Sequence, residues 1–137
     1  MKKLLTIILL LCSLSLYSQH RIINKEDIIG RWVEDADLES DSNHIEAHPY
    51  TYIFRENMIF HLGEIYDGVI IFNIAGKYTL DDNIISVVYY DLINGNAKTR
   101  KAHHISYEIV SLKNERMILL AKDNDYDYKI SLKRQLK

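Results

Sequence analysis

The chain has 137 residues and a formal net charge of −2, with 47% hydrophobic and 26% charged residues. This balance is typical of a single globular domain and excludes a disordered chain, while one proline and five glycines exclude collagen-like and proline-rich classes. Because the lysines and arginines form no basic block, we expect no nucleic-acid partner.

The N-terminal segment, residues 1–18, has the pattern of a secretory signal peptide. Lys2 and Lys3 precede an apolar run, and Ser18 offers a small residue for cleavage. The run is too short for a comfortable membrane span, and an uncleaved N-terminal anchor is the alternative. We therefore expect a signal peptide at 1–18 and one domain at 19–137. The mature domain is expected to be periplasmic or secreted, without stable insertion in a membrane.

The single cysteine, Cys12, lies inside this signal. A lipidated bacterial signal carries a small residue directly before its cysteine, whereas the residue here is Leu11, so lipid anchoring at Cys12 is disfavoured. If cleavage follows Ser18, the mature domain contains no cysteine. It can then be neither a disulfide scaffold, nor a thiol enzyme, nor a zinc protein with cysteine ligands.

The mature domain begins with one short helical turn, at residues 24–29. Asn24 suits the N-cap, Glu26 and Asp27 suit the positive end of a first turn, and Gly30 ends it. After it, short β-branched and aromatic runs, each closed by turn residues, predict eight strands. The predicted strands are residues 31–34, 50–55, 58–64, 69–80, 84–91, 98–112, 117–122 and 126–134.

Mostly short connections between these strands favour an all-β antiparallel meander. Asn94 and Gly95 give the clearest hairpin signal, and Gly76 marks a bulge or bend. Eight meandering strands usually remove their edges by closing into an up-and-down barrel; a two-sheet sandwich, which needs longer crossovers, is the alternative. The long acidic connection at residues 35–49 is expected to cover one mouth of the barrel.

Gly30-Arg31-Trp32, directly after the helical turn, resembles the G-x-W signature of the lipocalins. The resemblance implies a lipocalin-like, calycin-type barrel in which Trp32 plugs the closed end. It also implies that Arg134, on the last strand, packs its guanidinium over the indole. The wider layout is similar to small exported lipocalin-like domains of bacteria and covers most of residues 24–135. The matching segments are residues 30–32, 52–54, 76–80 and 128–134.

Strand parity predicts which side chains face the barrel interior. An eight-stranded barrel is either filled by such side chains or holds one small ligand. The chain has ten tyrosines, of which Tyr17 lies in the signal, so an apolar interior with hydroxyl groups is expected. The candidate ligand-binding residues are Tyr52, Phe54, Tyr78, Tyr107 and Tyr128.

Two kinds of metal site can be considered, and we favour neither, so no metal or cofactor is expected. Histidines suggest zinc, but two of them precede a proline in a loop and two adjacent ones point to opposite faces of a strand. Alternating acids suggest calcium, but neither run has the glycine of a calcium loop. The histidines are His44, His48, His61, His103 and His104; the acidic runs are Asp37, Glu39, Asp41, Asn43 and Glu46, and residues 123–127.

No catalytic motif is present: the sequence has no G-x-S-x-G, no H-E-x-x-H and no glycine-rich phosphate loop, so we expect no enzyme.

Two functions stay open. One is a binding module with a small apolar ligand in the barrel mouth, which an open cavity lined by Tyr52, Tyr78 and Tyr107 would favour. The other is a structural or protein-interaction domain of the cell envelope. A filled interior with an exposed apolar or acidic patch near residues 35–49 would favour it.

Overall fold

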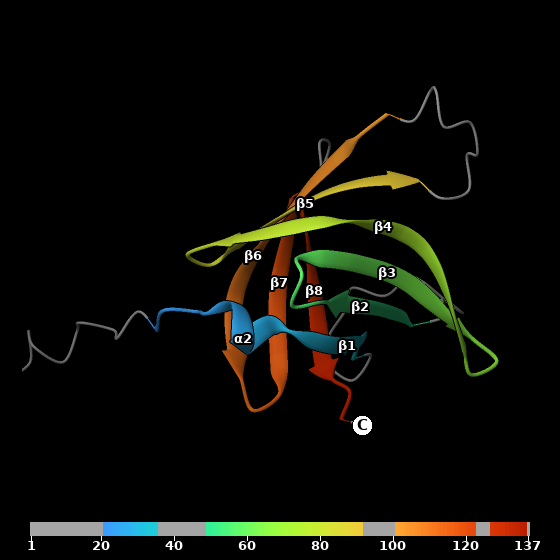
Figure 1. Ribbon diagram of the computed structural model, residues 1–137. Coiled ribbons are helices and arrows are strands. Elements are labelled where there is room, and N and C mark those ends of the chain that lie inside the picture. Colours follow the sequence, from blue (N-terminus) through green and yellow to red (C-terminus); the bar gives the residue numbers. More distant parts are fainter. Residues whose placement is uncertain (1–20, 36–48, 92–100, 123–126, 137) are drawn as a thin grey trace, which may run out of the picture.

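The computed structural model describes residues 21–35, 49–91, 101–122 and 127–136, which form one β-barrel (Figure 1). Within these ranges the chain forms no helix with the length and apolar character that a membrane crossing requires. The described elements are α2 (Lys25–Ile28), β1 (Gly30–Glu34), β2 (Tyr50–Phe54), β3 (Ile59–Tyr66), β4 (Val69–Asp81), β5 (Ile84–Asp91), β6 (His103–Lys113), β7 (Arg116–Lys122) and β8 (Asp127–Arg134).

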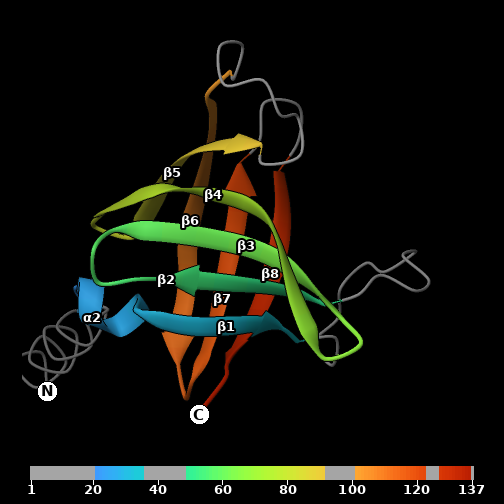
Figure 2. The ribbon, with the colours of Figure 1, turned by 45° about the vertical axis from the view of Figure 1, so that its right-hand side comes forward.

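Each strand pairs in antiparallel orientation with its neighbours in sequence, and β1 also pairs with β8. In that closing ladder Trp32 lies opposite Arg134 and Glu34 lies opposite Leu132. The sheet therefore closes on itself into a barrel (Figure 2). The predicted eight-stranded meander, its closure into a barrel and the helical turn before it are confirmed, and the sandwich is not formed.

Predicted and observed strand bounds agree to within two residues at every end but one. The exception is β6, which begins at His103 and not at residue 98. His103 is the first β6 residue that pairs with β5, opposite Tyr89, and Lys101 and Ala102 lie in no strand. A strand begins where its residues pair with a neighbouring strand. The alternation of apolar and polar residues in the sequence does not show where that pairing begins. The predicted hairpin turn at Asn94 and Gly95 lies outside the described residues.

At Gly76 a bulge or bend was predicted, and the bulge of β4 lies at Asn73 instead. The register of the β3–β4 ladder shifts between Leu62 and Gly63, and Asn73 is the extra residue there. Gly76 has a different role, because a Cβ at this position would lie 2.2 Å from the carbonyl oxygen of Val88. Glycine therefore permits a close approach of β4 and β5 rather than a change in register.

A layer of aromatic rings fills the middle of the barrel, and we call it the aromatic layer. Its ring centroids lie between 5.2 and 6.3 Å apart, in tilted or edge-to-face arrangements. No member is more than 4% exposed. Such contacts stabilise beyond the burial of area alone. The members are Tyr52, Phe54, Phe60, Tyr78 and Tyr107.

The two ends of the barrel differ. At one end lie α2 and the turns β2–β3, β4–β5 and β6–β7 (Figure 2). Trp32 lies at this end, hydrogen-bonded to Ile28 of α2, and we call it the plugged end. At the opposite end β1 finishes at Glu34, β2 begins at Tyr50, and the β3–β4 hairpin turns at Asp67 and Gly68. We call this opposite end the mouth. The aromatic layer separates the two.

Candidate functional site

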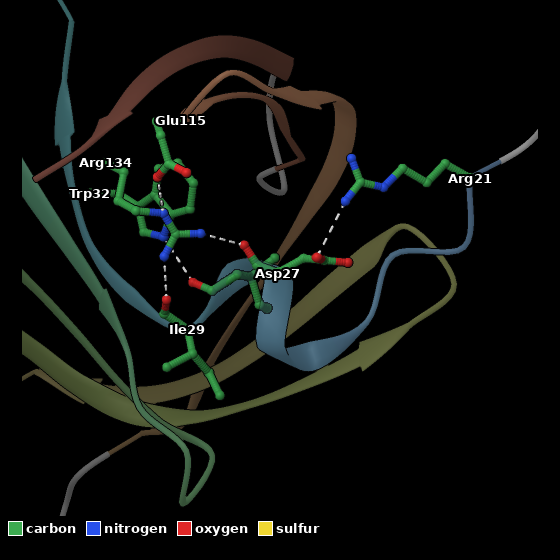
Figure 3. Close-up of polar contacts among 7 residues, drawn as sticks. Arg21, Asp27, Ile29, Trp32, Glu115 and Arg134 are labelled. Atoms are coloured by element: carbon green, nitrogen blue, oxygen red, sulfur yellow. Dashed lines mark hydrogen bonds and ion pairs between the residues drawn. The ribbon is translucent and has the colours of Figure 1, made fainter. Parts of the chain in front are cut away.

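Arg134 and Trp32 meet at the plugged end, as the lipocalin resemblance implied (Figure 3). The central guanidinium carbon of Arg134 lies 4.3 Å from the centroid of the Trp32 ring, and Trp32 is fully buried. The indole Nε1 of Trp32 donates a hydrogen bond of 2.8 Å to the carbonyl oxygen of Ile28. Cation–π attraction and packing therefore join α2, the first strand and the last strand.

The remaining donors of Arg134 hold the segment that leads from α2 into β1. Its Nη1 donates to the carbonyl oxygen of Ile29 and its Nη2 to that of Asp27, both at 2.6 Å. Its Nε pairs with the Glu115 carboxylate at 2.5 Å, from the β6–β7 turn (Figure 3). Carbonyl groups at the end of a helix have no partner within the helix, and here the guanidinium supplies one.

Gly30 is required at this junction for two independent reasons. Its φ of 134° lies where residues with side chains are rarely found. A Cβ on Gly30 would also lie 2.9 Å from Nη1 of Arg134. Gly30, Trp32 and Arg134 thus form one structural unit that closes the plugged end.

The five candidate ligand residues divide between two levels of the barrel. Phe54 and Tyr78 lie deep, in edge-to-face contact with ring centroids 5.2 Å apart, and each is 1% exposed. The Tyr78 hydroxyl donates a hydrogen bond of 2.7 Å to the carbonyl oxygen of Arg55, in the turn after β2. These two rings therefore form the side of the aromatic layer that faces the plugged end.

The other three candidates, Tyr52, Tyr107 and Tyr128, lie toward the mouth. The rings of Tyr52 and Tyr107 meet edge to face at 6.1 Å. Tyr128 shares the interior face of β8 with the buried Ile130 and is 37% exposed. Electrostatic interaction links Tyr128 to Tyr52. The structure therefore brings these three tyrosines together, and ligand contact by any of the five candidates stays a prediction.

Two carboxylates lie among these tyrosines at the mouth. Glu34 accepts hydrogen bonds from the backbone N–H of Tyr50, at 3.3 Å, and from the Tyr52 hydroxyl. Glu64 lies opposite Tyr50 across the β2–β3 ladder, is hydrogen-bonded to the Tyr50 side chain, and accepts a bond of 3.3 Å from Nδ2 of Asn73. We call Glu34, Tyr50, Tyr52, Glu64 and Asn73 the mouth cluster.

Burial sets the protonation of the mouth cluster. Burial raises the pKa of Glu34, and its hydrogen bonds from Tyr50 and Tyr52 offset only part of this rise. Burial also raises the pKa of Tyr52 well above its usual range, and the pKa of Tyr50 rises because of burial and then Glu64. The tyrosine hydroxyls therefore keep their protons at neutral pH and remain hydrogen-bond donors.

Exposed apolar side chains extend from the mouth along the β3–β4 hairpin, and we call them the lip. Each is at least one-third exposed. Ile71 lies opposite Glu64 in the β3–β4 ladder, so its side chain continues the interior face beyond the rim of the barrel. Contiguous exposed apolar surface of this kind commonly marks a binding site. The lip consists of Tyr66, Val69 and Ile71.

Sequence reasoning missed Glu34 and Glu64, although a signal for both was present. Glu34 follows Trp32 by two residues and Glu64 follows Leu62 by two, so strand parity places both acids on interior faces. It also missed that His103 shares an interior face with Tyr89. Their rings stack at 5.1 Å with an interplanar angle of 17°, so His103 is not simply a solvated residue.

Among the residues described, no three histidine, cysteine or acidic side chains come together in a way that could hold a metal ion. His103 and His104 lie on opposite faces of β6, opposite Tyr89 and Val88 respectively, as predicted. His61 lies on the outer face of β3. His44, His48, the acidic run at residues 37–46 and residues 123–126 lie outside the described residues.

No protein-family model matches this chain, and a comparison with curated proteins finds no similar sequence. The geometry of the barrel and the sequence patterns are therefore the basis for the function proposed below. They define a closed antiparallel β-barrel of eight strands, with one end plugged and a polar cluster at the mouth.

Proposed function

We propose that this protein is an exported, lipocalin-like binding protein that holds a small, mainly apolar molecule in the mouth of its barrel. The observation that carries the proposal is the hydrogen bond between Tyr52, in the aromatic layer, and Glu34, at the mouth. A few polar groups in an otherwise apolar site commonly fix the orientation of a bound ligand. The proposal assigns no catalytic role to the chain.

The aromatic layer limits how deeply the ligand can enter. Tyr52 and Tyr107, 4% and 2% exposed, are already in contact with each other and with Phe60. Interior packing of this density leaves no space for a second ring without displacement of the first. The ligand therefore rests on top of Tyr52 and Tyr107, in a shallow site.

The chemistry of the mouth indicates what the ligand carries. An apolar body is matched by the lip and by Tyr128, and burial of such surface drives binding. One hydroxyl or amine group is matched by the mouth cluster, because Glu34 accepts hydrogen bonds and the Tyr52 hydroxyl can also accept one. An anionic head group is disfavoured beside Glu34 and Glu64.

The lipocalin-like assignment is supported by the plug of Gly30, Trp32 and Arg134 after a helical turn, together with the closed meander. Export is supported by the signal-peptide pattern of residues 1–18. N-terminal sequencing of the protein from the periplasm or medium should give a chain that begins at Gln19. A chain that begins at Met1, or at a lipidated Cys12, would contradict the proposed export route.

A second function, a cell-envelope domain that binds another protein, is favoured by one specific observation. The aromatic layer is packed, and the lip is exposed apolar surface of the kind that protein partners cover. The two proposals differ in the role of Tyr128 and Tyr52. A protein partner would need the lip, whereas a small ligand would need the interior tyrosines.

Binding of the neutral fluorescent amine N-phenylnaphthylamine, followed by its emission, tests the first proposal. Tyr128→Ser should weaken binding about tenfold, equivalent to roughly 1.4 kcal/mol. Ile84→Ser is the matched control, because Ile84 is similarly exposed at 41% but lies on the outer face of β5, away from the mouth, and it should leave binding unchanged.

Equal loss in both variants, or in neither, would contradict a ligand in the mouth. If N-phenylnaphthylamine does not bind to the wild-type protein, while an Ile71→Asp variant loses association with a protein from the same host, the second function replaces the first.

A further inference from the structure

A hollow of about 520 Å³ lies on the outer face of the barrel, over β3, β4 and β5, away from the mouth and the plug. The volume falls within the range of small-molecule sites. The residues around it come from outward positions of the three strands, apart from Gly76, whose backbone is exposed between them. The lining residues are Ile59, His61, Ala75, Gly76, Lys77, Val88 and Tyr90.

The register of the strands explains why a convex sheet surface is hollowed here. His61, Ala75 and Tyr90 lie side by side across β3, β4 and β5, so the small Ala75 is flanked by two rings. Neighbouring strands are about 4.8 Å apart, which separates the backbones of His61 and Tyr90 by roughly 10 Å. The small Ala75 side chain thus forms the bottom of the hollow, and the aromatic rings of His61 and Tyr90 form its two sides.

Both aromatic walls are available for contact with a flat molecule. The His61 ring packs against the Phe72 ring at 5.2 Å, and Nε of Arg55 donates to its Nδ1 at 3.4 Å, so its orientation is fixed. Burial, and then the charge of Arg55, lowers the pKa of His61, so this ring is neutral at neutral pH. Tyr90 is 43% exposed.

A cation lies beside the hollow, in the next row of the sheet. Ile59, Lys77 and Val88 form that row, about 7 Å along the strands from Ala75. Ile59 and Val88 supply apolar contact, and the exposed Lys77 supplies a positive charge. If the ring of a ligand lies over Ala75, an anionic substituent on that ring can therefore form an ion pair with the Lys77 ammonium group.

The surroundings of the hollow are basic, although the chain as a whole is acidic. The two rows of outward residues that contain Ala75 and Lys77 continue across the neighbouring strands. They include Arg31 on β1 and His104 on β6, and Arg55 lies in line with them directly after β2. No described outward position of these two rows carries an acid. The nearest outward acid on β6, Glu108, is paired with Lys122 at 3.4 Å.

We propose that this hollow is a second binding site, which takes a small aromatic carboxylate. The ring of the ligand lies on Ala75 between His61 and Tyr90, and its carboxylate pairs with the Lys77 ammonium group. The site is separate from the mouth in position and in charge preference, because the mouth is lined by Glu34 and Glu64. It does not depend on the function proposed for the mouth.

Amide NMR of the full mature chain tests this inference, with naphthoate as the probe and naphthalenemethanol as its neutral analogue. Naphthoate should shift the amides of residues 59–61, 75–77 and 88–90 in a saturable manner. It should bind about tenfold more tightly than the neutral analogue at low salt. Added salt should reduce that difference, because the ion pair is exposed.

Two substitutions with matched controls locate the site. Ala75→Leu fills the hollow and should weaken naphthoate binding about tenfold or more, whereas Thr79→Leu, outward on the same strand but outside the hollow, should not change it. Lys77→Gln should weaken binding about threefold, as for an exposed ion pair. Lys133→Gln, outward on β8, should have no effect.

The inference is overturned if naphthoate shifts the amides of Tyr52 and Tyr128 instead, since the probe then occupies the mouth. It is also overturned if Ala75→Leu and Thr79→Leu have the same effect, if the neutral analogue binds equally well, or if no saturable shift is seen. Failure of the mouth proposal alone would leave the predicted shifts around Ala75 intact.

Discussion

The Arg134 guanidinium makes contacts both on its flat face and along its edge. Its flat face covers the Trp32 ring, its two Nη atoms donate to the carbonyl oxygens of Ile29 and Asp27, and its Nε pairs with Glu115. A lysine ammonium group is a point charge that can neither stack flat on indole nor hold two carbonyl groups in this fork geometry. Arginine is therefore specifically required at this position.

Substitutions at the plugged end should reveal this dependence. Trp32→Ala should lower the free energy of unfolding by about 3–5 kcal/mol, as large aromatic deletions from cores do. Arg134→Lys should cost about 2 kcal/mol, because two carbonyl groups lose their best donors, whereas Lys133→Ala, exposed next to it, should stay within about 0.5 kcal/mol. Urea unfolding measures all three, and an Arg134→Lys variant as stable as wild type would refute the role given to the guanidinium.

Glu34 should make the stability of the barrel depend on pH. Its pKa is raised in the folded state above the ordinary 4.5, so the folded chain binds more protons than the unfolded chain in that interval. The free energy of unfolding therefore falls as pH rises from 4.5 through the raised pKa of Glu34. Glu34→Gln removes this dependence, because its amide does not titrate.

Urea unfolding of wild type and Glu34→Gln across this pH interval measures the effect. The stability of wild type relative to the variant should decrease with rising pH, while Glu56→Gln, an exposed residue in the β2–β3 turn, serves as the control. A relative stability of wild type that increases with pH would mean that hydrogen bonds from Tyr50 and Tyr52, and not burial, dominate at Glu34.

At the scale of strands, the sequence could predict each element, because interior positions alternate with outward ones along the strands, apart from the bulges in β4 and β6. Tyr50, Tyr52 and Phe54 on β2 are an example, and the structure places all three on the interior face. The β6 start and the bulge at Asn73 could not be predicted, since both depend on which residue of the partner strand lies opposite.

The candidate site could be predicted in part. Parity identified the interior tyrosines, but it could not separate those packed beside the plug, such as Tyr78, from those near the mouth, such as Tyr128. That distinction depends on the level at which each strand crosses the barrel, and hence on register. Glu34 joins the mouth cluster only because the pairing of β1 with β2 sets it next to Tyr50 and within hydrogen-bond reach of the Tyr52 hydroxyl.

The contact of β4 with β5 gives a prediction at this scale. Gly76→Ala should lower the free energy of unfolding by about 2 kcal/mol or more, since the new Cβ would lie 2.2 Å from the backbone oxygen of Val88. Gly68→Ala, in the β3–β4 turn, has nothing within 4 Å of the new Cβ and only a φ of 77° to maintain, so it should cost about 1 kcal/mol. Thermal unfolding of both variants checks this order, and a smaller loss for Gly76→Ala would contradict the close approach of the strands.

At the scale of the whole molecule, the aromatic layer divides the barrel into a half that holds the fold together and a half available for function. The plug, α2 and three short turns lie on one side, and the mouth cluster and the lip lie on the other. Changes at the exposed Tyr128 should therefore alter binding with less than about 1 kcal/mol effect on stability. Changes at Trp32 or Arg134 in the plug should instead lower the stability of the fold.

Native mass spectrometry of the mature protein, purified from its own host, tests most directly whether the mouth holds a small molecule. The proposed function predicts one added mass per chain, from a single small molecule, that is retained in Ile84→Ser and lost in Tyr128→Ser. A bare chain from every growth condition, or an added mass that both variants retain, would contradict it.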